Sequence, residues 1–175
     1  MPFSNERIAI ATTQDVSYLN ILLNEAYRGK SSKQGWTTEA HLIAGETRTN
    51  ESMVQQVIEK PGSVILKYIN NDKVITGCIN LQQHEDKLYL GMLAVHPGLQ
   101  GGGVGKELLK ASEEYARSIQ CSAIYMTVIS LRTELINWYV RHGYKDTGKR
   151  KQFDEDGVTG KHLQPLEFIV LEKNV

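Results

Sequence analysis

The residues that could most readily do chemistry form a glycine-rich turn. Four glycines, Gly101, Gly102, Gly103 and Gly105, lie within five residues, between an apolar run that ends at Val95 and a helical pattern. Glycine adopts backbone conformations that other residues avoid and lets a ligand approach the chain closely. The first amides of a helix have no partner within it and lie at the positive end of its dipole. The turn therefore predicts a site for an anion such as a pyrophosphate.

The spacing of these residues distinguishes between phosphate-binding motifs. A P-loop requires Ser or Thr after Gly105-Lys106, where this chain has Glu107, and glycine at the position of Gln100. A dinucleotide-binding G-x-G-x-x-G requires a third glycine where the chain has Lys106 or Leu108. The pattern Q/R-x-x-G-x-G/A is satisfied in full by residues 100–105. A glycine-rich turn that only precedes an ordinary helix is the alternative interpretation.

The surrounding sequence predicts the elements that position this turn. Strand-like runs cover 7–11, 63–69, 73–83, 87–95, 123–129, 144–153 and 166–171. Helical spacing covers 13–28, 39–44, 50–60, 104–118 and 131–142, with Gly29 expected to end the first helix. Short polar turns join the three runs from 63 to 95, which predicts an antiparallel meander. The run at 123–129 is almost continuously apolar, as in a strand that is buried on both faces and paired in parallel. The order of elements indicates a single mixed α+β domain over 1–175.

Composition and charge exclude several classes of protein. The chain has 175 residues, of which 41% are hydrophobic and 23% charged, so a disordered chain, collagen and a coiled coil are excluded. Its 20 Lys and Arg balance 20 Asp and Glu. We therefore expect no nucleic-acid partner and no membrane partner. The basic run from Lys145 to Lys151 is followed by acidic residues and is interpreted as a solvated hairpin.

Cysteine, histidine and leader patterns give further expectations. We see no signal peptide and no membrane-spanning run, so a cytoplasmic location is expected. Cys78 and Cys121 lie in apolar contexts without a C-x-x-C spacing, which favours buried reduced thiols over a disulfide. The five histidines show no metal-ligand spacing, so no metal is predicted.

The motif at residues 100–105 resembles that of the GNAT superfamily of acyl-CoA-dependent N-acetyltransferases. Residues 93–97, Leu-Ala-Val-His-Pro, are similar to the family's fourth strand, and residues 139–144 resemble its Y-x-x-x-G-[FY] motif. The resemblance covers nearly the whole chain, from Arg7 to Leu171. It implies the GNAT-like fold, a mixed and mostly antiparallel sheet of about seven strands flanked by about four helices. In that fold, parallel strands 4 and 5 splay apart around the CoA site.

The resemblance also implies an activity and a set of site residues. Acetyl-CoA would be the co-substrate, and the Leu93 N–H would hold the thioester oxygen. The implied cofactor-binding residues are Leu93, Ala94, Val95, Gln100, Gly101, Gly102, Gly103, Val104, Gly105 and Lys106. Tyr139 would be the general acid that protonates the departing thiolate, since a tyrosine is a weak but sufficient donor. A core aromatic on the inner face of the helix is the alternative for Tyr139, and its neighbour Trp138 is interpreted as packing.

Two positions depart from the family pattern. Many members have an Asn seven residues before the tyrosine, where this chain has Arg132. Arg132 is expected to contact the cofactor's phosphate or an acidic substrate group, or to cap the helix. Several members have a Glu where this chain has Tyr89. His84 and Glu85 are nearby but fall in an expected turn, so the general base stays unassigned.

The segment from Gly29 to Arg48 would build the acceptor pocket in this family. Trp36 and Glu39 are the candidate substrate-binding residues, as an apolar wall and a counter-charge for an amine, and Arg48 could meet a carboxylate. Helix capping by Thr37 or Thr38 and packing of Trp36 are the alternative. We expect acetylation of a small-molecule amine or amino-acid-like acceptor. A non-catalytic acyl-CoA sensor or interaction module is the rival, protein acceptors are a third reading, and homodimers are common in the family.

Overall fold

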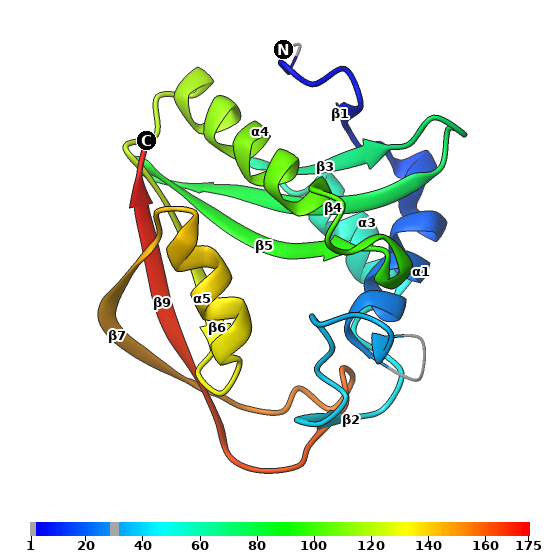
Figure 1. The fold of residues 1–175 in the computed structure, drawn as a ribbon, viewed down its shortest axis with the longest axis vertical. Helices are drawn as coiled ribbons and strands as arrows, with labels where there is room; N and C mark the ends of the chain where they lie inside the picture. Colours follow the sequence, from blue (N-terminus) through cyan, green and yellow to red (C-terminus); the bar gives the residue numbers. More distant parts are fainter. Residues whose placement is uncertain (1–2, 29–31) are drawn as a thin grey trace.

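A computed structural model describes residues 3–28 and 32–175. Its main sheet has seven strands in the order β1-β3-β4-β5-β6-β9-β7 (Figure 1). The strands are β1 (Ile8–Ile10), β3 (Ser63–Ile69), β4 (Ile75–His84), β5 (Lys87–Val95), β6 (Ala123–Ile129), β7 (Lys145–Phe153) and β9 (Leu166–Asn174). Four α-helices lie in this part of the chain: α1 (Val16–Tyr27), α3 (Glu51–Glu59), α4 (Val104–Ser118) and α5 (Thr133–Arg141). The predicted α+β class and seven-stranded mixed sheet are confirmed.

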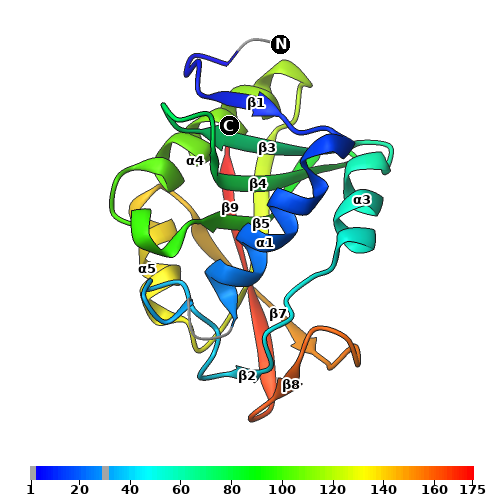
Figure 2. The same ribbon diagram turned by 90° about the vertical axis from the view of Figure 1, so that its right-hand side faces the viewer.

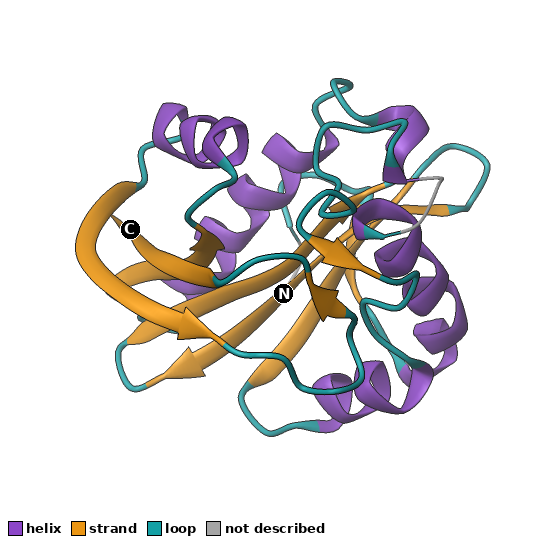
Figure 3. Ribbon diagram, turned by 90° about the horizontal axis from the view of Figure 1, so that it is seen from below, coloured by secondary structure: helices purple, strands orange, loops and turns teal. Residues whose placement is uncertain are grey.

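The helices cover the sheet from both sides. Figures 2 and 3 show α1 and α3 on one face and α4 and α5 on the other. Each face of the sheet packs against its helices in a separate hydrophobic core. Successive side chains of a strand point to opposite faces, so one strand contributes to both cores. On β3, Leu66 packs with the α4 and α5 side chains and its neighbour Ile65 with those of α1 and α3. The apolar face of α4 contributes several buried side chains to the core on its side of the sheet, among them Leu108 and Leu109.

The centre of the sheet is where parallel strands part. β5 and β6 are the parallel pair, and their register covers only residues 87–89 against 123–125. Beyond Tyr89 the two strands no longer pair, so the C-terminal half of β5 has one open side. A bulge also interrupts the pairing of β5 with β4 near Met92, whose φ is 51°. The bulge reverses the alternation, so Leu93 joins the α4 and α5 core with Leu88 and Leu90.

The region after α1 differs from the sequence prediction. Residues 39–44 were expected to be helical, which is wrong: the chain turns, and Ile43–Ala44 form β2, paired with β8 (Lys161–His162). Buried Leu42 and Ile43 pack there against Ile129 and Leu166 in a small third core. This tertiary packing outweighs a short helical pattern. The first helix is also shorter than predicted, since Thr13–Asp15 form a 3₁₀ turn, and Gly29 lies outside the described residues.

Both cysteines, Cys78 and Cys121, are buried free thiols. Within residues 3–28 and 32–175, none of the helices has the length and apolar character that crossing a membrane would demand.

Candidate active site

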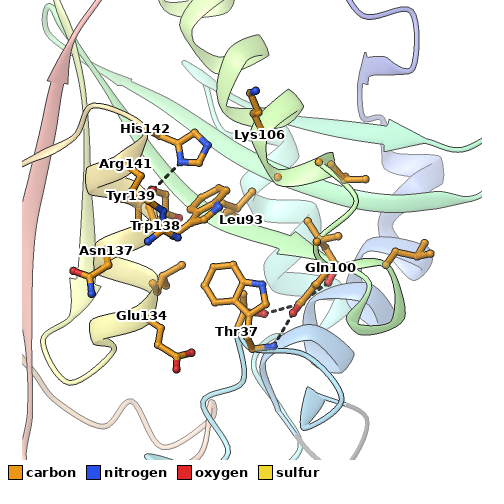
Figure 4. Close-up of a pocket in the computed structure, with 18 of the residues that line it drawn as sticks. Thr37, Leu93, Gln100, Lys106, Glu134, Asn137, Trp138, Tyr139, Arg141 and His142 are labelled. Atoms are coloured by element: carbon orange, nitrogen blue, oxygen red, sulfur yellow. Dashed lines mark hydrogen bonds between the residues drawn. The ribbon is translucent and has the colours of Figure 1, made fainter.

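A cavity of about 580 Å³ opens between the C-terminal half of β5, the start of α4 and α5 (Figure 4). Its walls come from four segments: the end of α1 with the loop after it, the end of β5 with the glycine turn, the first turn of α4, and α5. The lining residues are Tyr27, Trp36, Thr37, Leu93, Val95, Leu99, Gln100, Gly101, Gly103, Val104, Gly105, Lys106, Glu134, Leu135, Asn137, Trp138, Tyr139, Arg141 and His142. The parting of β5 from β6 is what leaves room for it.

The glycine turn forms one end of this cavity. Gly101 and Gly103 have φ of 89° and 87°, a conformation that L residues with a side chain rarely adopt, and a Cβ on either would meet no atom within 4 Å. Gly103 is the N-cap of α4 and makes no side-chain cap hydrogen bond. The amides of Val104, Gly105 and Lys106 therefore have no partner within the helix and line the cavity. The turn offers open backbone donors to an anion.

Gln100 does not point its amide at this open space. Its Oε1 accepts a hydrogen bond from the Trp36 N–H at 2.8 Å, and its Nε2 donates to Thr37 Oγ1 at 2.7 Å and to the Val95 carbonyl at 3.2 Å. The side chain thus ties the loop after α1 to the end of β5. Gly35 lies directly against it, because a Cβ there would come within 2.3 Å of Gln100 Oε1.

Aromatic side chains make the wall on the α5 side. The Trp138 ring lies 5.0 Å from that of Tyr139 and 4.5 Å from that of His142, centroid to centroid. It also packs on the first turn of α4, where a Cβ on Gly105 would be 3.2 Å from it. Trp36 reaches Trp138 from the loop after α1, with ring centroids 5.9 Å apart. These rings bring α5, the glycine turn and the loop after α1 together around one space.

Two buried tyrosines, Tyr27 and Tyr139, line the cavity together with Leu93. The Tyr27 hydroxyl donates a hydrogen bond to the Leu93 carbonyl, which joins the end of α1 to the open part of β5. Tyr139 is 4% exposed and lines the same cavity from α5. Burial raises the pKa of Tyr27 to about 12 and holds the pKa of Tyr139 well above its usual value, while the charge of Arg132 partly opposes both shifts. Both hydroxyls therefore carry a proton at neutral pH.

A buried ionic cluster lies behind Tyr27. The Glu39 carboxylate accepts from Arg28 Nη2 at 3.1 Å and from Arg132 Nη1 at 3.2 Å, and the three side chains are 10%, 1% and 7% exposed. Arg132 also donates to the Thr37 carbonyl, and Arg28 to the carbonyls of Thr47, at 3.0 Å, and Thr159. The cluster joins α1, the loop after it, the start of α5 and the β7–β8 connection.

The residues expected from the sequence fall into two groups. Ten of them surround the cavity: Trp36, Leu93, Val95, Gln100, Gly101, Gly103, Val104, Gly105, Lys106 and Tyr139. Four are placed elsewhere in the described structure: Ala94 in the α1 core, Gly102 beside the cavity-lining glycines, and Glu39 and Arg132 in the ionic cluster. Arg132 is the N-cap of α5 but makes no side-chain cap hydrogen bond.

Sequence reasoning missed other residues of the cavity wall. Tyr27 gave no signal beyond its place in the apolar stripe of a helix, and its contact with Leu93 spans 66 positions. Trp138 and His142 are four positions apart at the end of α5, and only the fold brings Trp138 against Gly105 in the first turn of α4. Tyr89, which replaces the family's Glu, lies outside this cavity, with its ring 5.4 Å from that of Tyr125 and its hydroxyl 3.4 Å from Thr127 Oγ1.

Known proteins share this architecture. The structure resembles that of the ribosomal-protein-alanine N-acetyltransferase from Brucella melitensis, with a TM-score of 0.71, 19% identity, and 96% of this chain and 99% of that one covered. For the ribosomal-protein-S18-alanine N-acetyltransferase from Escherichia coli the values are 0.70, 13%, 96% and 92%. For a GNAT-family acetyltransferase from Staphylococcus aureus they are 0.67, 17%, 95% and 97%. At these identities the likeness shows the fold.

Sequence comparison adds the family. No curated protein matches the chain. The family model described as "Acetyltransferase (GNAT) family" matches residues 32–144, which include β5, the glycine turn, α4 and α5. The chain therefore belongs to the GNAT family of acetyltransferases.

Proposed function

We propose that this chain is an N-acetyltransferase that moves the acetyl group of acetyl-CoA directly to the amine of a small-molecule or amino-acid-like acceptor. One observation carries the proposal: a single cavity runs from the uncapped first turn of α4 to Leu93 and Tyr139. An anion-binding end and a buried proton donor are thereby joined along the open edge of a strand. Acyl transfer from a phosphate-bearing thioester can use that combination, because the anion site holds the phosphates and the proton donor assists the leaving thiolate.

The residues of the cavity fit acetyl-CoA. The amides of Gly101 and of residues 103–106 would hold its pyrophosphate, because these residues line the cavity and the glycines leave room for a close approach. The backbone of Leu93 and Val95, unpaired on the β6 side, would hold its extended arm. When bound, acetyl-CoA supplies a thioester carbonyl that an amine can attack.

Leu93 would act through its backbone. An N–H donor set at the carbonyl oxygen stabilises the transition state more than the ground state, since that oxygen gains charge as the carbon becomes tetrahedral. The hydrogen bond from Tyr27 to the Leu93 carbonyl fixes the preceding bulge and the end of the strand in place. Tyr27 is thus a positioning residue, because its hydroxyl proton is donated to the Leu93 carbonyl and is not free for the leaving thiolate.

Tyr139 would protonate the leaving thiolate. Its raised pKa keeps the proton on the hydroxyl, and the same burial makes a thiolate in this cavity more basic than in water, which restores the driving force for proton transfer. The amine must lose a proton before or during attack, and no residue is assigned to that step.

The test is acetyl transfer itself. Purified protein is incubated with acetyl-CoA and a panel of amines, amino acids and peptides, with thiol release followed and the acetylated product identified by mass. Release above the no-amine rate, with acetylated product, supports the proposal and names the acceptor class. If no amine in the panel gives thiol release while calorimetry still shows CoA binding, the result favours a non-catalytic acyl-CoA sensor. If there is neither thiol release nor CoA binding, the proposed pyrophosphate-binding role of the glycine turn is overturned.

A further inference from the structure

An arginine without a carboxylate partner lies beside Tyr27. The guanidinium carbon of Arg48 is 5.6 Å from the centroid of the Tyr27 ring, and the Arg132 guanidinium carbon lies at the same distance from that ring. Tyr27 in turn lines the cavity and contacts Leu93 through its hydroxyl. The Arg48 guanidinium and the Leu93 carbonyl thus contact the ring and the hydroxyl of one side chain, and Leu93 is the residue proposed to hold the thioester oxygen.

Positive charge exceeds negative charge around this ring. Arg28 and Arg132 share the single carboxylate of Glu39. In residues 3–28 and 32–175, Arg48 makes no ion pair with any carboxylate. Asp156, the next acidic group toward Arg28, already accepts hydrogen bonds from Val158 and Thr159. The guanidinium of the half-buried Arg48 is therefore without a carboxylate partner in the described structure.

The backbone holds Arg48 firmly in this position. The segment between β2 and α3 passes along α1 (Figure 2), where Asn24 Oδ1 accepts from the backbone N–H groups of Arg48 and Thr49. Asn24 Nδ2 donates back to the Thr49 carbonyl at 3.1 Å. A guanidinium that rests on an aromatic ring keeps its in-plane N–H donors available, and their fork geometry matches a carboxylate. The site is set for an anionic group that the chain itself does not supply.

We propose that Arg48 binds a carboxylate of the acceptor, so that the enzyme prefers amines carrying a free carboxylate, such as amino acids, over the corresponding amides. The proposal rests on the proposed function and names its substrate class. Glu39 does not compete for Arg48, because both of its oxygens are taken by Arg28 and Arg132. An acceptor carboxylate at Arg48 would replace the missing counter-charge.

The experiment compares an amino acid with its C-terminal amide in the wild-type protein, Arg48→Gln and Arg48→Lys. Loss of one charge-assisted hydrogen-bonded pair is expected to raise the KM of the acid roughly 10- to 100-fold in Arg48→Gln, with the KM of the amide nearly unchanged. Arg48→Lys keeps the charge but loses the fork, so an intermediate KM is expected. Arg117→Gln, an exposed arginine on α4, is the control and should match wild type.

Binding of the same two probes in the presence of CoA, measured by calorimetry, separates the two proposals. Arg48-dependent binding of the acid without turnover supports the carboxylate site and overturns acetyl transfer to such acceptors. Equal KM and equal affinity for acid and amide, with Arg48→Gln like wild type, overturns the carboxylate site and leaves the proposed function standing. Preference for a peptide amine without a free carboxylate overturns it in the same way. Absence of both binding and turnover overturns both proposals.

Discussion

The two ends of the proposed active site use different chemical groups: backbone amides at the CoA end and charged side chains at the acceptor end. The proposed CoA end would use backbone amides from one stretch of chain, between Leu93 and Lys106, with α5 beside it. Behind the proposed acceptor end lies a buried cluster of charged side chains from distant segments, in which Arg28, Glu39 and Arg132 are joined across more than 100 positions. Backbone recognition tolerates many side chains as long as the glycines remain, whereas a charge cluster depends on each of its members.

This difference predicts how each end responds to substitution. The CoA end should lose binding without losing the fold, because its glycines face open space. The acceptor end should lose stability and acceptor recognition together, because its charges are buried.

The largest effect is expected for Gly103→Asp. The side chain would project from an open position with φ of 87°, block the amides of the turn and repel a pyrophosphate. Loss of two or more charge-assisted hydrogen bonds corresponds to a roughly 1000-fold rise in the Kd for CoA, measured by calorimetry. Gly148→Asp is the matched control, because Gly148 has φ of 83° and equally open surroundings but lies in β7. Micromolar affinity in Gly103→Asp would contradict the phosphate role.

Next in size is the effect of Tyr139→Phe on turnover. Removal of the proton donor should lower kcat by about 100-fold, at the lower end for general acids, because a thiolate is already a fair leaving group. The KM for acetyl-CoA should change little. A general acid works only while protonated, and the raised pKa of Tyr139 means that its ionisation should not depress kcat until the pH is well above 10.

Tyr144→Phe is the matched control for this substitution. The two rings are 5.7 Å apart and both are buried, but the Tyr144 hydroxyl has no hydrogen-bond partner in the described structure and does not line the cavity. Tyr144→Phe should keep full kcat. Equal losses in the two variants would show that Tyr139 serves packing, the alternative raised by its sequence pattern.

The sequence predicted the elements around the proposed CoA end far better than those around the proposed acceptor end. The spacing of Gln100 to Gly105, the helical spacing over 104–118 and the apolar run at 123–129 are local signals. The helix α4 and the strand β6 have the bounds that these patterns predict. The role of Glu39 was inferred from its charge alone, and nothing local indicates that Arg28 and Arg132 occupy it. The local pattern of β2 likewise predicts a helix, since the residues of β8 that pair with it lie 117 and 119 positions away.

A smaller effect is expected for Glu39→Gln, which tests the acceptor end. Truncating one member of a buried ionic group leaves uncompensated charge and typically costs 3–5 kcal/mol, and about 2 kcal/mol is expected here since glutamine keeps one acceptor oxygen. Urea unfolding measures it. Glu172→Gln breaks a half-exposed pair with Lys87 and should cost less stability than Glu39→Gln, because water screens the pair. CoA affinity should be unchanged in both, and a weakened CoA site in Glu39→Gln would mean that the two ends are not separable.

The smallest effect concerns how stability depends on pH, through the buried thiol of Cys78 and the buried hydroxyls of Tyr27 and Tyr139. Burial raises the pKa of the Cys78 thiol to about 12, so the folded state keeps its proton at pH values where the unfolded state loses it. The free energy of unfolding should therefore fall between about pH 9 and 12, by at most about 1.4 kcal/mol per pH unit for this group. Tyr27 and Tyr139 add to the fall only above about pH 10.

Cys78→Ala isolates this contribution. Urea unfolding at pH 7, 9 and 10 should show a shallower decline than in wild type, on top of a constant loss of about 1 kcal/mol from the smaller side chain. Cys121→Ala is the comparison, because burial also raises the pKa of Cys121 but less completely, so its decline should be closer to that of wild type. The same decline in wild type and Cys78→Ala would mean that alkaline sensitivity arises in the tyrosines, and that the core behind Tyr27 admits a charged thiolate that its packing should exclude.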